Sequence, residues 1–82
     1  MTGKENKRSN LTELDEGQTG VIISLAGGRI SSKRLADLGL IPGIEIKVLR
    51  KALFSGPVQI EICGSRLVLG RGLASKILVE KK

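Results

Sequence analysis

The chain has 82 residues, a formal net charge of +6, no histidine, one cysteine (Cys63) and one aromatic residue (Phe54). This composition excludes an internal disulfide, a tetrahedral nitrogen and sulfur metal site, and catalysis by a Ser–His or Cys–His pair. The length fits one small domain with an aliphatic core. Half of the charge excess lies in the two terminal segments, and the basic balance permits contact with RNA, anionic lipid or an acidic protein face without choosing among them.

The N-terminal segment, MTGKENKRSN, is polar and lacks the apolar core of a signal peptide. We expect a flexible tail over residues 1–9 and a single barrel domain over residues 10–80. No apolar run approaches the roughly 18 residues of a membrane span, so we expect a cytoplasmic protein without membrane insertion. Asn10 can cap a short turn that places Leu11 and Leu14 on one side.

Residues 20–25 predict a first strand, with Ile22 on one face and three residues on the other: Val21, Ile23 and Leu25. The following Ala-Gly-Gly breaks this strand before a short helix. The pattern predicts that helix over residues 33–38, with Ser31 or Ser32 as its N-cap.

The end of the helix is the most structured part of the sequence. Gly39 can take the left-handed C′ conformation, which brings Leu40 against Leu35 in a Schellman motif. Pro42 and Gly43 then fit the two central positions of a type II turn. This segment therefore predicts a fixed corner that leads directly into a strand.

Residues 44–51 and 58–63 predict a hairpin, with a bulge near Leu49 where the alternation breaks. A register that pairs Lys47 with Glu61 gives a favourable cross-strand charge pair. The inward positions of the two strands are aliphatic: Ile44, Ile46, Val48, Val58, Ile60 and Ile62.

The C-terminal part predicts a tight turn at residues 64–65, a short strand at 67–69, a helical turn within 70–76 and a last strand at 77–79. A flat sheet of this size cannot bury both faces. We therefore expect a mainly β protein, a small SH3-like barrel of about five short strands with one short helix and a second helical turn.

No metal or cofactor site is expected. The candidate carboxylates are scattered over different predicted elements: Asp15, Glu16, Asp37, Glu45 and Glu61. Cys63 has no base nearby in the sequence that would activate its thiol. We expect no catalytic residue.

Two surfaces are candidates for binding a partner. Leu53 and Phe54 lie at the predicted hairpin tip, where Phe54 either covers the open end of the barrel or forms an apolar knob with Leu53. The second surface is the corner with Leu38, Leu40 and Pro42, although its leucines also fit the core. Arg34 belongs to a basic rim suited to an acidic partner, with Lys33, Arg50, Lys51 and Arg71.

Three segments carry a family resemblance: LTELDEGQTGVI, RLADLGLIPGIEIKV and GPVQIEICGSRLVLGRGLASKILV. Together they span residues 11–79 and resemble the FeoA family of small cytoplasmic proteins of bacterial ferrous iron uptake. The resemblance implies an SH3-like barrel without enzymatic activity. It also implies a partner, the cytoplasmic region of FeoB, the membrane ferrous iron transporter with a GTPase domain.

The alternative function is an RNA-binding SH3-like or KOW-type domain, which the basic charge and the segment GQTGVIISL favour. Single-stranded RNA recognition usually stacks bases on several aromatic rings, and this chain has one. We therefore expect no specific nucleic-acid partner, and weak self-association stays open.

Overall fold

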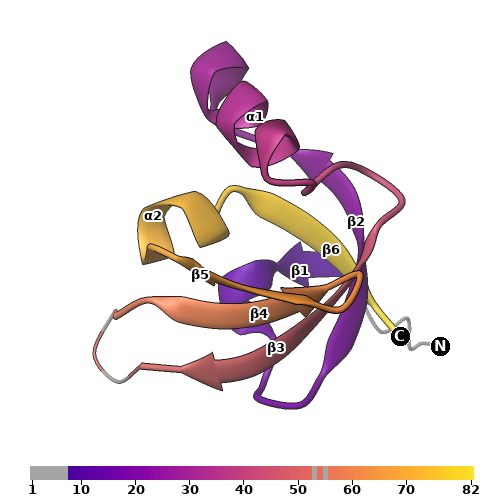
Figure 1. Cartoon of the computed structure of the whole chain (residues 1–82), viewed down its shortest axis with the longest axis vertical. Helices are drawn as coiled ribbons and strands as arrows, with labels where there is room; N and C mark the ends of the chain where they lie inside the picture. The colour runs from indigo at the N-terminus through magenta and orange to yellow at the C-terminus, as the bar shows by residue number, and fades with distance from the viewer. Residues whose placement is uncertain (1–7, 53, 55) are drawn as a thin grey trace, which may run out of the picture.

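The computed structural model describes residues 8–52, 54 and 56–82, and Figure 1 shows one antiparallel sheet that curls around a core. In the described residues the sheet has six strands in the order β1-β6-β2-β3-β4-β5. A mainly β fold with one short helix and a second helical turn is confirmed, with one strand more than expected. The elements are β1 Arg8–Asn10, η1 Leu11–Glu13, β2 Thr19–Leu25, α1 Gly28–Asp37, β3 Glu45–Lys51, β4 Val58–Ile62, β5 Ser65–Leu69, α2 Arg71–Ala74 and β6 Ile77–Lys81.

The additional strand is β1, which comes from residues that the sequence pattern assigns in part to a flexible tail. Arg8 and Ser9 pair with Glu80 and Val79 of β6. The segment is polar, so its place in the sheet depends on backbone hydrogen bonds to β6 rather than on an apolar face. Arg8 and Ser9, expected in a flexible tail, are therefore strand residues.

The turn after β1 forms as expected. The Asn10 side chain accepts a hydrogen bond from the Thr12 N–H at 2.9 Å, and the Glu13 carboxylate accepts one from the Asn10 N–H at 2.9 Å. These reciprocal bonds are a capping box, and they fix a short 3₁₀ turn that buries Leu11 and Leu14 completely.

In β2 the core receives Ile22, which is 1% exposed, while Val21 and Ile23 of the expected three-residue face are only half-buried; Leu25, its third member, packs against the core. Gly20 is also buried, and β6 lies so close that an added Cβ would be 3.1 Å from the Glu80 carbonyl oxygen. The pairing of β2 with β6 shifts register between Ile22 and Ser24, a bulge that the sequence pattern did not predict.

The helix α1 begins five residues earlier than the pattern predicts, and the expected serine cap is wrong. Its N-cap is Gly27, with φ +94°, and both Ser31 and Ser32 lie inside the helix. A contact distant in sequence sets this start, because the Ala26 N–H donates a hydrogen bond to the Lys76 carbonyl at 2.7 Å.

The helix ends as predicted. Gly39 has φ +91°, the Leu40 N–H donates to the Leu35 carbonyl at 2.9 Å, and the Gly39 N–H donates to the Ala36 carbonyl at 2.9 Å. This pair of bonds is the Schellman motif. Both of its leucines are fully buried, so the helix end is fixed to the core.

The chain then turns into β3 through the expected corner. The Ile44 N–H donates to the Ile41 carbonyl at 3.2 Å, and Gly43 has φ +95°. A positive φ at the third residue of the turn is what a type II turn requires.

The hairpin of β3 and β4 confirms two predictions. Lys47 lies opposite Glu61, and the pairing shifts register between Val48 and Arg50, so a bulge lies at Leu49. Five of the six expected inward residues are buried in the core: Ile46, Val48, Val58, Ile60 and Ile62. The sixth, Ile44, is half-buried and packs against the core.

The turn between β4 and β5 lies one residue earlier than expected. Cys63, with φ +46°, and Gly64, with φ +80°, form its centre, and Ile62 pairs with Ser65. Two consecutive positive φ values are typical of the two-residue type I′ hairpin, which matches the twist of the flanking strands.

Candidate functional site

The tip of the β3–β4 hairpin presents the one aromatic ring of the chain to solvent. Phe54 is 94% exposed and has φ +54°, a left-handed conformation that few residues other than glycine adopt. The hypothesis that Phe54 covers an open end of the barrel is therefore wrong. Leu53, its expected partner in an apolar knob, lies outside the described residues.

A groove of about 200 Å³ lies beside this tip. The Ala52 N–H donates to the Pro57 carbonyl at 3.0 Å and closes the hairpin below Phe54. In the groove, Val68 of the neighbouring strand β5 is 65% exposed. We call Phe54 and the groove residues the hairpin-tip surface: Arg50, Lys51, Ala52, Phe54, Pro57, Gln59 and Val68.

Two cations of the expected basic rim make hydrogen bonds within the protein. The Lys51 ammonium donates to the Leu14 carbonyl at 2.9 Å, and the Lys51 N–H donates to the Glu16 carboxylate at 2.9 Å. The Arg71 guanidinium donates to the Gly56 carbonyl at 3.4 Å, on the other side of the hairpin. These bonds hold the hairpin in place, and they leave the exposed Arg50 as the cation that the hairpin-tip surface offers to an acidic group.

The second predicted surface, the corner after α1, is only partly available. Leu38 is 44% exposed and Pro42 is exposed, but Leu40 is fully buried by the Schellman motif. The expectation that Leu40 contacts a partner is therefore wrong. Arg34 is exposed on α1, and Figure 1 shows α1 at the top of the molecule, far from the hairpin tip at the lower left.

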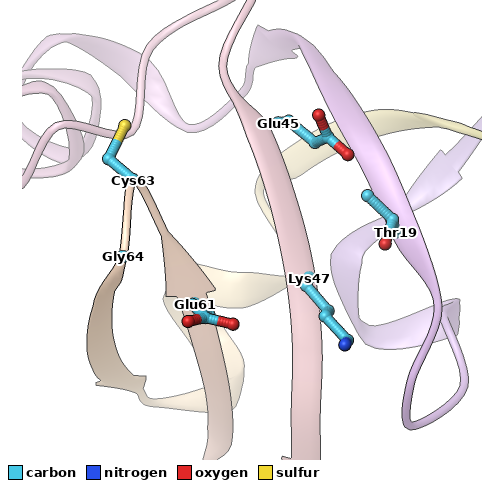
Figure 2. A pocket seen from close by; sticks show the side chains of 6 residues that line it. All are labelled: Thr19, Glu45, Lys47, Glu61, Cys63 and Gly64. Atoms are coloured by element: carbon cyan, nitrogen blue, oxygen red, sulfur yellow. The ribbon is translucent and has the colours of Figure 1, made fainter.

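A second groove, of about 400 Å³, crosses the outer face of the sheet (Figure 2). Lys47 of β3 lies between Thr19 of β2 and Glu61 of β4. Glu45 lies farther along β3, with its carboxylate 3.4 Å from the Lys82 ammonium. Among the described residues, no group of three or more Asp, Glu or Cys side chains is placed to hold a metal ion. The groove is therefore a polar surface of mixed charge.

Val68 and Gln59, with Ala52 and Pro57 of the same groove, are functional candidates that the sequence analysis missed. Val68 and Gln59 both lie on the outer face of their strands, one position away from the core residues Leu69 and Ile60. The alternation of β5 does predict an outward Val68. What it cannot predict is that β4 and β5 place Val68 next to Gln59 and beside the hairpin tip.

Comparison with known proteins gives a consistent result. A relative from Methanocaldococcus jannaschii, whose assigned name is Fe(2+) transport protein A, is 38% identical over 65 residues, which cover 79% of this chain and 77% of the relative. The crystal structure of an iron uptake regulatory protein, FeoA, is 33% identical, covers 92% of this chain and 99% of its own, and has a TM-score of 0.85.

The fold agrees with a third solved structure. FeoA of Stenotrophomonas maltophilia, described as a prokaryotic SH3 domain protein, has a TM-score of 0.74 at 23% identity and covers 87% of this chain and 88% of its own. The fold of this chain is therefore SH3-like. Since the model of the FeoA domain matches residues 9–81, the chain belongs to the FeoA family.

Proposed function

We propose that this protein is a non-enzymatic, cytoplasmic accessory factor of ferrous iron uptake that binds the cytoplasmic region of the transporter FeoB through the hairpin-tip surface. Membership of the FeoA family supports the role in iron transport. The names of the relatives, an Fe(2+) transport protein and an iron uptake regulatory protein, support the same role.

The exposure of Phe54 is the observation on which the choice of surface rests. A phenylalanine side chain contributes about 2–3 kcal/mol when it is removed from water, and at 94% exposure the folded monomer gains almost none of this. A protein partner that covers the ring would gain it on binding. Aromatic anchors beside a pocket are typical of the few residues that dominate binding free energy.

The chemistry of the surface indicates the kind of site that it fits. In the groove, Ala52, Pro57 and Val68 are apolar, while Arg50 and Gln59 supply polar groups. An apolar centre with a polar rim is the usual arrangement of a protein interface. On FeoB we expect the matching site to be an apolar pocket with a carboxylate placed to meet Arg50.

The test is a titration of the isotope-labelled protein with the soluble cytoplasmic domain of FeoB at near-physiological salt, followed by amide NMR. We expect shifts at residues 50–59 and at Val68. Phe54→Ala should weaken binding by about tenfold or more. Ile30→Ser is the matched control, because Ile30 is exposed on α1, at the other end of the molecule.

The proposed function fails if the domain produces no shifts, or if Phe54→Ala binds as tightly as the unchanged protein while remaining folded. An excess of RNA in the same titration tests the alternative function. Displacement of the FeoB domain by RNA, or shifts with RNA alone that weaken steeply with salt, would favour RNA binding instead.

A further inference from the structure

The helix α1 is attached to the barrel by few contacts. Within α1, all of which the structure describes, Leu35 alone is buried. A side-chain hydrogen bond reaches the helix from the other end of the chain: the Lys76 ammonium donates to the Ser31 hydroxyl at 3.5 Å. Most of the surface of α1 therefore faces solvent, at one end of the molecule (Figure 1).

The solvent face of α1 carries two parallel rows of side chains, because residues four apart lie one above the other on a helix. One row is Ile30, Arg34 and Leu38, of which Ile30 is 79% exposed and Leu38 44% exposed. The adjacent row is Arg29, Lys33 and Asp37, all exposed.

The turn after the helix adds another exposed aliphatic residue, Ile41, which is 44% exposed. Two aliphatic side chains, Ile30 and Leu38, thus share the solvent face of the helix with three cations, Arg29, Lys33 and Arg34, and the exposed Ile41 follows in the next turn. The single acid in this surface, Asp37, is 3.6 Å from the Lys33 ammonium. We call these residues the helix surface; its net charge is positive.

We propose that the helix surface binds an anionic lipid bilayer. The three cations would lie at the level of the lipid phosphates, and Ile30 and Leu38 would enter the headgroup layer. Interfacial helices bind in this way, by apolar side chains that reach the acyl boundary and by basic side chains that attract anionic lipid. The contact is peripheral, since no described helix is long and apolar enough to cross a membrane.

Charge and shape argue for lipid over the other occupants. A second copy of this chain would place one positive helix surface against another, and like charges oppose that contact. A folded protein partner needs a complementary pocket around its contact residues, but the helix surface is the convex side of a helix. None of its residues lines either of the two grooves described above. A soft, flat and negatively charged bilayer needs no such pocket.

The geometry leaves the hairpin-tip surface uncovered. Ile30 lies near the start of α1 and Leu38 is its C-cap, a rise of about 12 Å along the helix, so both side chains can rest on one plane of lipid. Because α1 and the hairpin tip lie at different ends of the molecule in Figure 1, a protein resting on α1 keeps Phe54 exposed to the aqueous side. The inference does not depend on the proposed binding to FeoB.

The test is co-sedimentation of the full chain with vesicles of equal parts phosphatidylglycerol and phosphatidylcholine, compared with vesicles of phosphatidylcholine alone. We expect binding to the anionic vesicles only, weakening as salt is raised. Arg34→Glu should lower the partition coefficient at least roughly fivefold, because one cation near the surface contributes about that factor. Ile30→Ser should also lower it.

Two variants with the same changes elsewhere serve as matched controls. Arg66→Glu reverses an exposed charge on β5, and Val68→Ser removes an exposed aliphatic side chain from the same strand. Both should bind anionic vesicles as the unchanged protein does, and amide NMR spectra should confirm that all four variants are folded.

Three outcomes would overturn the inference: equal binding to both kinds of vesicle, no binding to either, or the same loss in the β5 variants as in the α1 variants. If Ile30→Ser and Arg34→Glu instead abolish binding to the FeoB domain and leave vesicle binding intact, the helix surface binds protein and the lipid assignment is wrong.

Discussion

Phe54 combines two unfavourable features for a folded monomer, a left-handed backbone and an exposed ring. A left-handed conformation costs an ordinary side chain roughly 1–2 kcal/mol. Residues that bear such a cost are often found at functional sites. The ring makes no buried contact that could offset this cost. A hairpin turn can impose the backbone conformation, as it does at Cys63, so the exposed ring is the feature that the proposed contact with a partner explains.

This leads to a prediction at the scale of one residue. Phe54→Gly removes the left-handed strain and no buried surface, so the free energy of unfolding should stay unchanged or rise by up to about 1 kcal/mol. Binding to the cytoplasmic domain of FeoB should weaken at the same time. Urea denaturation and the NMR titration measure the two quantities. A loss of more than about 1 kcal/mol in stability would mean that Phe54 packs against the barrel.

Other single residues show where sequence patterns are sufficient and where they fail. Leu40 could be assigned to the Schellman contact because Gly39 fixes its position in the chain. That same contact buries Leu40, so the pattern that located it also argued against its role as a contact residue. The positive φ of Cys63 could not be predicted, because the residue type does not favour it and the two-residue turn imposes it.

At the scale of elements, the parts that could be predicted have local causes. The capping box at Asn10, the end of α1, and the bulge at Leu49 each follow from residues within about one turn or one strand. The missed features depend on contacts distant in sequence. The strand β1 is polar and exists through its pairing with β6, and the start of α1 depends on the carbonyl of Lys76.

Replacing Gly39 or Gly72 by alanine should change the free energy of unfolding in opposite directions. Gly39→Ala should lower the free energy of unfolding by about 1–2 kcal/mol, because the Schellman motif needs φ near +91°. Space is not the reason, since an added Cβ would meet only the Ile62 side chain, at an ordinary 3.5 Å.

Gly72 lies within α2 and an added Cβ there meets nothing within 4 Å. Gly72→Ala should therefore raise the free energy of unfolding by about 0.5–1 kcal/mol, as the unfolded chain loses conformational freedom. Denaturant unfolding of both variants is the measurement. If Gly39→Ala leaves the free energy of unfolding unchanged or raises it, backbone conformation does not control stability at the end of α1; if Gly72→Ala lowers it, the expected gain in α2 is wrong.

At the scale of the whole molecule, the small barrel separates its surfaces. The core of buried aliphatic residues fixes the sheet, and the hairpin tip and α1 extend from it at different ends (Figure 1). The sequence analysis named residues from both surfaces, Phe54 and Arg34 among them. It could not place the surfaces relative to each other, because their separation depends on the order of strands in the sheet.

If both proposals are correct, the two surfaces bind together when FeoB is embedded in an anionic bilayer. The first contact raises the effective concentration for the second, so the apparent affinity should exceed that for the soluble FeoB domain by about a hundredfold or more. Ile30→Ser should remove this gain and leave binding to the soluble domain unchanged. Phe54→Ala should weaken binding in both settings.

The gain is measured as the difference in affinity for FeoB in vesicles with and without phosphatidylglycerol. Val68→Ser should weaken binding as Phe54→Ala does, because Val68 lines the groove of the hairpin-tip surface. Equal affinity for soluble and embedded FeoB would show that the two contacts do not form at once. Two contacts strengthen each other only if both can form in the same complex. Equal affinity would therefore mean that the helix surface faces away from the bilayer when FeoB is bound. Each surface could still bind its own partner separately.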